Sequence, residues 1–443
     1  MKISTKRYFE AAKKAGIEPF QLTYSTQRET SVEVFNGEVE TQQIGTSTDI
    51  GGKGILKGKQ GSFGTDFIDS STPELMMKKI VESAKFGKEE KDENYYHNDL
   101  DIRYRRAKTD LKDFKPATLK ELREFAITLS QKVRQQDPRL AKVFVSVTME
   151  ERRGFKENSY GVRCQDKTRL FVGSIGVVAE DEKGEPRSGG EMFYSFLSLD
   201  DLAKEADRIL ERTIRSALDF FGTGPVKGKP YKIVFSPSSF SSLLFFYLGQ
   251  LDAKSVQKHL SVFEGRKDTK TASSALTLLH TPHTTCPSSS SYDADGVPSQ
   301  DFTLLKNGVL KTYFYSVETA REDKVPSNGC ASGAGYAGPI CLTVKSGRST
   351  KEDLFRRMKN GLYITSINGL NSGINGQTLD FSLPCAGYVV SDGKIQKATS
   401  MILIAGNLRT LFEDIVALGN DSEYAGGCFT PSVLVRKLSV SGQ

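Results

Sequence analysis

The chain has 443 residues and a net charge of +7, from 61 Lys and Arg residues against 54 Asp and Glu residues. At about 100–200 residues per domain, this length predicts two or three domains. The basic residues form no long run, which argues against a dedicated DNA-binding protein. No apolar run approaches the roughly 20 residues of a membrane helix, and the first residues lack the apolar stretch of a signal peptide. We therefore expect a soluble, cytoplasmic protein without membrane or nucleic-acid partners.

The first half of the chain predicts two successive units in which strands lead into an amphipathic helix. In the first unit, Asn36-Gly37 indicates a tight hairpin, because both residues tolerate a positive φ angle. In the second unit, Thr118 and Glu121 form a capping-box pattern at the start of a helix. The intervening residues 88–115 carry charges of both signs, and we interpret them as a solvated connection. The predicted segments are a helix over 5–15, strands over 20–67, a helix over 72–84, a helix from 118, strands over 142–196 and a helix over 199–221.

The second half has a different pattern, which follows a linker rich in Gly and Pro. Residues 262–293 show little regular pattern and are expected to form a long loop. Asn307-Gly308 indicates a hairpin within a run of strands. The predicted segments are a strand over 232–235, a helix over 240–251, strands from 302, a helix over 351–361 and a helix over 408–418.

Together these patterns predict an α+β protein of two domains. The N-terminal domain, residues 1–222, would contain the two strand-plus-helix units, whose similar order suggests an internal repeat. The C-terminal domain, residues 223–443, would be mostly β with a few helices.

The residue types that most often bind metals are few and scattered. None of the six cysteines forms a C-x-x-C pair, so we interpret them as reduced thiols. His280 and His283 flank Pro282, and in an extended segment their side chains would point to different faces. Asp293 and Asp295 lack the further ligands of a calcium loop and predict a turn. The residues alone therefore do not indicate a metal site.

The most specific signal is the order of several short segments spread over nearly the whole chain. They are SVEVFNGEVE at 31–40, IVFSP at 233–237, YDADGVP at 292–298, LKNGVL at 305–310, GLYIT at 361–365, IAGNL at 404–408 and PSV at 431–433. In this order they resemble the TldD/PmbA (TldE) family, which is also named peptidase family U62 and modulator of DNA gyrase.

The resemblance implies a two-subunit zinc metallopeptidase that processes or degrades unfolded peptides. In the TldD-like subunit, an H-E-x-x-x-H helix supplies zinc ligands and a general base. The matching segment here, residues 245–250, reads FFYLGQ and contains neither histidine nor glutamate. Cys428 lies near a late metal ligand of TldD-like chains, but one thiolate does not hold a catalytic zinc. The resemblance therefore implies the PmbA/TldE-like subunit, with no metal, no other cofactor and no catalytic residue in this chain.

On this interpretation a TldD-like partner supplies the zinc, and this chain holds an extended peptide in a cleft through added-strand hydrogen bonds. Phe245, Phe246 and Tyr247 could line the cleft, or they could pack their helix into the core. The remaining candidates could contact the peptide or could serve local turns. They are Gly249, Gln250, Asp295, Gly296, Gly406 and Asn407.

Two other functions stay open at this point. The gyrase-modulator name and the net charge of +7 suggest a protein that binds DNA or a DNA enzyme, with binding that weakens steeply with salt. Alternatively, the chain could hydrolyse peptides by itself as a homodimer, without the usual zinc motif. The sequence names neither the peptide nor the oligomeric state.

Overall fold

The computed structural model describes residues 4–99 and 102–442, and the chain divides into two compact units. The units are Met1–Phe221 and Gly222–Gln443, so the division falls one residue before the expected boundary. Both units combine helices and strands, which confirms the α+β class. Within the described ranges, no helix is both long enough and apolar enough to cross a membrane.

The N-terminal unit is built on an antiparallel sheet of long strands, which are β1 (Phe20–Phe35), β2 (Glu38–Leu56), β3 (Lys59–Thr65), β4 (Leu140–Asn158), β5 (Arg163–Glu180) and β6 (Pro186–Ser195). Their order across the sheet is β3-β2-β1-β4-β5-β6. β1 pairs with β4 from Gln21↔Asn158 to Phe35↔Phe144. The two predicted strand-plus-helix units therefore meet along this central pair.

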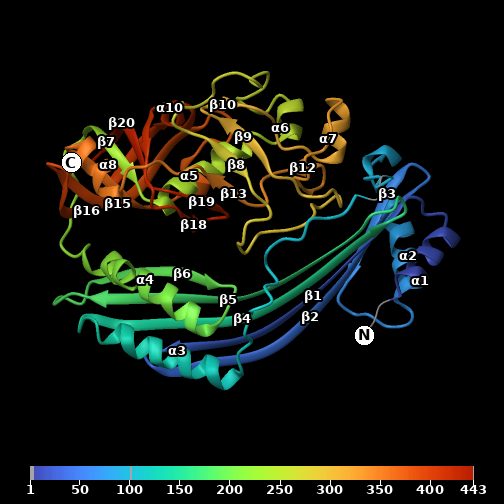
Figure 1. The fold of residues 1–443 in the computed structure, drawn as a ribbon, viewed down its shortest axis with the longest axis horizontal. Helices are drawn as coiled ribbons and strands as arrows, with labels where there is room; N and C mark the ends of the chain where they lie inside the picture. The colour runs from blue at the N-terminus through green and yellow to red at the C-terminus, as the bar shows by residue number, and fades with distance from the viewer. Residues whose placement is uncertain (1–3, 100–101, 443) are drawn as a thin grey trace. The chain divides into compact units, whose positions relative to one another are not determined.

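Helices cover the two ends of this sheet separately (Figure 1), and they are α1 (Thr5–Lys14), α2 (Thr72–Ala84), α3 (Leu119–Arg134) and α4 (Leu199–Leu218). α1 and α2 enclose one core, which includes Tyr8 and Met76. α3 and α4 enclose another, which includes Leu122 and Ile209. The predicted capping box is confirmed, because the Thr118 and Glu121 side chains exchange backbone hydrogen bonds at the start of α3.

Residues 88–115 are less solvated than the sequence predicts. A short 3-10 turn, Asp92–Asn94, is followed by the buried Tyr95. Near the end of the segment, Phe114 is buried and its ring lies 5.2 Å from that of Phe171. The charged composition hid these two aromatic anchors, so the segment contributes to the core as well as connecting the two halves of the unit.

The C-terminal unit contains a sheet that closes on itself, made of β7 (Lys229–Phe235), β14 (Gly361–Ile367), β15 (Asp380–Ser391), β16 (Lys394–Asn407), β17 (Ile415–Leu418) and β20 (Val433–Ser441). Its order is β16-β15-β14-β7-β20-β17, and β16 also pairs with β20. The pairs Leu403↔Ser441 to Ala405↔Ser439 make this closure. The result is a ring of strands with an apolar interior.

A second sheet of short strands lies in the same unit, made of β8 (Leu278–His280), β9 (Phe302–Lys306), β10 (Val309–Leu310), β13 (Leu342–Val344), β18 (Glu423–Ala425) and β19 (Cys428–Thr430). Its order is β10-β9-β8-β13-β19-β18. A small hairpin, β11 (Ala331–Gly333) and β12 (Tyr336–Ala337), forms a separate two-stranded sheet of the same unit. β8 falls inside the predicted long loop 262–293, so that loop contains a strand that its polar composition did not reveal.

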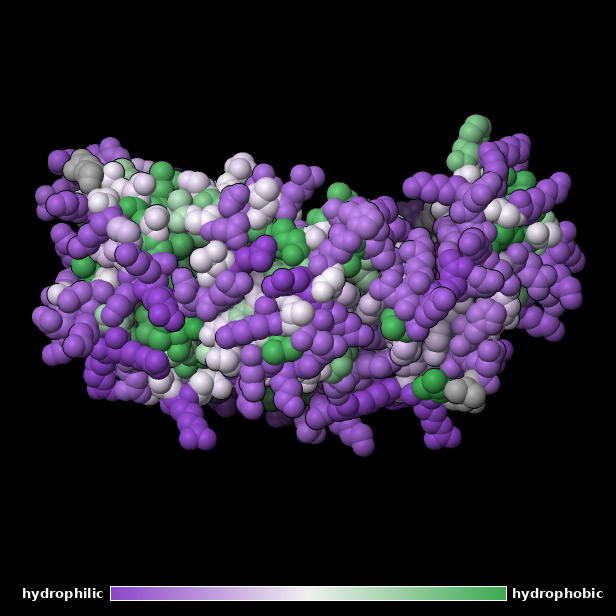
Figure 2. Space-filling model, turned by 90° about the horizontal axis from the view of Figure 1, so that it is seen from above, coloured by the Kyte–Doolittle hydropathy of each residue, from purple (hydrophilic) through white to green (hydrophobic). Residues whose placement is uncertain are grey.

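The helices of this unit are short and connect the strands, and they are α5 (Pro237–Gly249), α6 (Ala253–Gln257), α7 (Val317–Glu322), α8 (Lys351–Met358), α9 (Leu370–Gly373) and α10 (Leu408–Glu413). The predicted helix over 408–418 is therefore too long. The helix ends earlier because residues 415–418 form β17, which pairs with β20. Figure 2 shows a largely hydrophilic face on which apolar side chains form small, separate patches.

Candidate functional site

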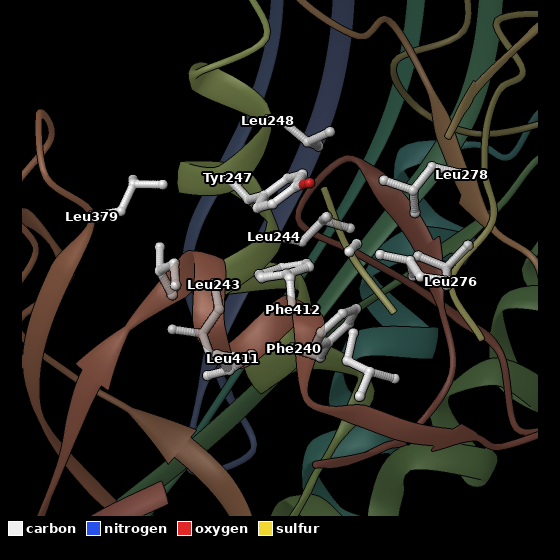
Figure 3. Close-up of a cluster of buried hydrophobic side chains, with 14 of the residues drawn as sticks. Phe240, Leu243, Leu244, Tyr247, Leu248, Leu276, Leu278, Leu379, Leu411 and Phe412 are labelled. Carbon is white, nitrogen blue, oxygen red and sulfur yellow. The ribbon is translucent and has the colours of Figure 1, made fainter. Parts of the chain in front are cut away.

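α5 carries most of the predicted site, and one of its faces is the centre of the C-terminal core (Figure 3). Ser236 caps its first turn and Pro237 occupies the first helical position, which suits a residue without a backbone N–H. Side chains of this face pack against α10, the start of β8 and the segment before it. They are Phe240, Leu243, Leu244, Tyr247 and Leu248, with Phe412, Leu411, Leu276 and Leu278 opposite.

Tyr247 belongs to this buried face, which agrees with the core-packing alternative and not with a place in a cleft. Its side chain is 0% exposed, and its ring stacks on Phe412 with 4.3 Å between the centroids. The hydroxyl donates a hydrogen bond to the Thr271 carbonyl oxygen at 3.2 Å. Burial raises the pKa of Tyr247, so the phenol stays neutral. With no exposed surface, this ring supports the helix and cannot line a cleft.

Phe245, two residues earlier, lies on the opposite face of α5. Its side chain is 67% exposed. It meets Phe246 edge to face with 5.8 Å between the ring centroids, and Phe246 in turn packs partly against the core. Gly249 follows one turn later and is exposed. Phe245 is therefore the member of the aromatic trio that is most available to a ligand.

Gln250 follows the last residue of α5 and is held firmly by backbone groups. Its Nε2 donates to the Gly376 carbonyl oxygen at 2.7 Å. Its Oε1 accepts from the Val262 N–H at 3.1 Å. The side chain is buried, and both ends of its amide serve to join loops to the helix end.

The loop that Gln250 holds also contacts the candidate Asn407. Asn407 Oδ1 caps α10 by accepting from the Arg409 N–H at 2.9 Å, and Nδ2 donates to the Thr378 carbonyl oxygen at 2.8 Å. The structure thus links these two candidates through the loop around 376–378. Gly406 is exposed beside them, and a Cβ there would lie 2.9 Å from Leu438 Cδ1.

Asp295 and Gly296 lie in a different part of the unit and form the predicted turn. Asp295 Oδ2 accepts from the Val317 N–H at 3.0 Å, at the start of α7. Gly296 has a φ angle of +87°, which favours glycine. The neighbouring Asp293 accepts the Val297 N–H at 2.9 Å, so these carboxylates serve the local backbone. The turn is held by α7 and by its own side chains rather than by α5.

Cys428 lies against the first half of α5. Its Sγ is 3.0 Å from the Ser241 Oγ, one helical turn before Phe245. Ser241 also donates to the Ala425 carbonyl oxygen at 2.7 Å, which fixes the β18–β19 hairpin on the helix. Burial raises the pKa of Cys428 to about 11, so its thiol is protonated near neutral pH.

The residues at the matching position of the zinc motif do not fit zinc. Phe245 and Phe246 have no ligand atom, the amide of Gln250 is engaged with the backbone, and the Cys428 sulfur contacts the Ser241 hydroxyl. Across residues 4–99 and 102–442, no three or more His, Cys, Asp or Glu side chains are grouped so as to hold a metal ion. We therefore derive no chemical step through a metal in this chain.

The two neighbouring histidines are held separately in the core. His280 Nδ1 lies 2.8 Å from the Gln300 carbonyl oxygen, and its Nε2 accepts from the Ile340 N–H at 3.2 Å. His283 Nδ1 instead lies 3.3 Å from Asp301 Oδ1. Burial lowers the pKa of His280 to about 4, so its ring is neutral at pH 7.

Sequence reasoning missed two contacts between side chains of this unit. One joins Ser241 to Cys428, and the other brings the sulfur atoms of Cys286 and Cys341 to 3.0 Å. The partners are 187 and 55 positions apart, respectively. The packing of α5 on the β18–β19 hairpin makes the first contact, and the pairing of β13 with β8 brings the segments of the second together. Neither arrangement follows from a local sequence pattern.

Two family domains match the chain. Residues 227–442 match the PmbA/TldA metallopeptidase C-terminal domain, and residues 112–217 match the PmbA/TldA metallopeptidase central domain. The metalloprotease PmbA of Escherichia coli O157:H7 is 31% identical over 170 residues, which cover 38% of this chain and 36% of that relative. The matches to this and two similar curated relatives each span about a third of the relative's length.

Solved structures resemble the whole chain. A crystal structure from Thermotoga maritima, named as a proposed modulator of a DNA gyrase, has a TM-score of 0.87 at 26% identity, with 99% of both chains covered. TldE from Thermococcus kodakarensis has a TM-score of 0.84 at 17% identity, over 99% of this chain and 100% of that one. The second likeness is one of fold alone. With both family domains matched over most of its length, the chain belongs to the PmbA/TldD metallopeptidase family.

Proposed function

We propose that this chain is the non-catalytic, metal-free subunit of a two-subunit peptidase, and that a TldD-like partner carries the zinc. One observation supports this most directly. Where the TldD-like motif has its first histidine, this chain has an exposed phenylalanine, Phe245, and where the motif has its second, the amide of Gln250 is used by two loops. Residues 245–250 can therefore contribute a contact surface, and they supply no zinc ligand.

The role of this chain in the complex is to hold an unfolded peptide in extended form. Phe245 has an exposed aromatic ring. This ring contacts Phe246, which packs against the core. A supported ring of this kind gives contact area at little entropic cost, because few torsion angles are frozen on binding. We assign the peptide-contact role to this exposed face of α5.

The first test measures metal content and hydrolysis. The purified, untagged chain should hold less than about a tenth of an equivalent of zinc, since zinc sites require several deprotonated ligands. Alone it should not cleave an unfolded peptide, and addition of a TldD-like subunit should give cleavage that exceeds that of the partner alone. A partner whose motif Glu is replaced by Gln controls for contaminating peptidases.

Three results would overturn the proposal. One firmly held zinc per chain would show that a donor set exists after all. Peptide cleavage by this chain alone would instead support an autonomous homodimer. Salt-sensitive binding to duplex DNA, with no effect on a TldD-like partner, would favour the DNA-related function.

A substitution tests the peptide-contact role. In the reconstituted complex, Phe245→Ala should lower kcat/KM for the peptide by roughly tenfold, the effect of losing one aromatic contact. The matched control is Phe67→Ala, which removes a ring that is equally exposed, at 69% against 67%, in the N-terminal unit. If both variants lower kcat/KM equally, or neither does, Phe245 has no particular role in peptide binding.

A further inference from the structure

Two thiols of the C-terminal unit lie in direct contact although they are distant in the sequence. Cys286 belongs to the loop after β8, and Cys341 directly precedes β13. Their sulfur atoms are 3.0 Å apart, and the side chains are 1% and 0% exposed. The Thr281 N–H donates to the Cys341 carbonyl oxygen at 2.9 Å, which fixes the base of the loop on the strand.

Polar groups around this pair make its two thiols unequal. The hydroxyl oxygens of Ser288 and Ser289 lie 3.4 and 3.1 Å from Cys286 Sγ. The Ser289 hydroxyl donates to the Thr284 carbonyl oxygen, whereas the Ser288 hydroxyl can donate to a Cys286 thiolate. The contact with Cys341 and this hydroxyl lower the pKa of Cys286. The pKa of Cys341 is raised, chiefly by its contact with Cys286. Within the pair we assign the attack on an oxidant to Cys286, beside the Ser288 hydroxyl, and the resolving step to Cys341.

Other thiols of the unit lack this arrangement. Burial raises the pKa of Cys385 to about 12 and that of Cys428 to about 11. Burial also raises the pKa of Cys330, whose sulfur lies 3.7 Å from His280 Nε2. These thiols have hydroxyl, imidazole or backbone neighbours, whereas Cys286 and Cys341 have each other.

We propose that Cys286 and Cys341 form a reversible intramolecular disulfide when the protein meets a peroxide. The Cys286 thiolate attacks one peroxide oxygen, the O–O bond breaks, and the departing hydroxide takes a proton to become water. The sulfur of Cys341 then attacks the sulfenic sulfur of Cys286, and a second water leaves. Overall, two thiols and one hydrogen peroxide give one disulfide and two waters, and a thiol reductant reverses the change.

The disulfide would tie the loop after β8 to the strand that supports the candidate site. β13 pairs with β19 through Leu342↔Cys428, and Cys428 contacts Ser241 on α5. The crosslink spans 55 positions of the chain. Closing a loop of this size restricts the unfolded chain, so oxidation should raise the Tm of the C-terminal unit by roughly 5–10 °C. The inference does not depend on the proposed peptidase role.

The test treats the reduced, full-length protein with hydrogen peroxide, blocks remaining thiols by alkylation and measures intact mass and proteolytic peptides. We expect a loss of two hydrogens, a crosslinked peptide pair containing Cys286 and Cys341, the rise in Tm, and reversal by dithiothreitol. An oxidised protein in which these two thiols are not joined, or in which either is joined to Cys428, would overturn the proposal. So would a protein that peroxide leaves fully reduced.

Variants separate the two steps. Cys341→Ser should stop at the sulfenic acid, which a dimedone probe traps on Cys286, whereas Cys286→Ser should give neither probe adduct nor crosslink. Cys385→Ser is the matched control and should retain the full reaction. If a serine variant loses its fold by circular dichroism, the alanine variant replaces it, because alanine leaves no unpaired hydroxyl. Dimedone labelling of Cys341 in the Cys286 variant would refute the assigned roles.

Discussion

Phe245 and Tyr247 stand two residues apart on one helix, yet they belong to different parts of the protein. Tyr247 is enclosed by Phe412 and the Thr271 carbonyl group, whereas Phe245 is 67% exposed. The sequence leaves both aromatic rings with the same two alternatives, a cleft or the core, because a six-residue motif does not say which side of the helix is covered. The difference teaches that burial separates the residues that support this site from those that can act in it.

The largest expected effect on stability comes from the buried residue of this pair, Tyr247. Tyr247→Ala should lower the free energy of unfolding by about 3–5 kcal/mol, since it leaves a cavity in the core. Tyr247→Phe keeps the stacking and should cost only about 1 kcal/mol, the value of one hydrogen bond. Urea unfolding followed by circular dichroism measures both. Equal costs for the two variants would mean that the ring is not packed as described.

The buried His280 gives the next effect, in the pH dependence of stability. Its folded pKa of about 4 lies below the ordinary value of 6.5, so the unfolded chain binds a proton that the folded chain does not. Stability should therefore fall as the pH drops from 6.5 to 4, by roughly 3 kcal/mol in total. In His280→Gln this contribution to the slope should vanish, while His259→Gln, at an exposed site, should keep it. An unchanged slope in His280→Gln would contradict the buried, neutral ring.

A smaller effect is expected at the end of α5. Gln250→Ala should lower the free energy of unfolding by about 1–3 kcal/mol, because the Gly376 carbonyl and the Val262 N–H lose their partner. Gln135→Ala, at the exposed end of α3, should change it by less than about 0.5 kcal/mol. Denaturant unfolding of the two variants in parallel gives the answer. If Gln250→Ala leaves the free energy of unfolding nearly unchanged, the two hydrogen bonds of this amide do not support the fold.

The smallest change in stability is expected at Phe245. Phe245→Ala should shift the free energy of unfolding by no more than about 0.5 kcal/mol, since a largely exposed ring contributes little to the core. The same urea titration used for Tyr247 measures it. A cost of about 2 kcal/mol or more would remove the contrast between the two residues and make Phe245 a core residue as well.

Local signals in the sequence predicted local structure well. The capping box at Thr118, the Asn36-Gly37 hairpin and the turn at Asp295 all form as expected. The errors came where pairing with a distant strand decides the secondary structure. Residues 415–418 continue a helical pattern, but they form a strand because they pair with β20. Cys286 and Cys341 show the same limit, because their contact depends on the pairing of β8 with β13. Periodicity reports which face is apolar and says nothing of which partner covers it.

The closure of the ring sheet also has a consequence for how the protein is made. β7 lies between β14 and β20, and β20 comes about 200 residues later in the chain. At ribosomal speeds of about 5–20 residues per second, a nascent β7 waits at least ten seconds or so for that neighbour. During this interval its apolar side chains, Ile233, Val234 and Phe235, lack their final cover. The C-terminal unit is thus the part of the molecule for which a chaperone bound during synthesis would matter most.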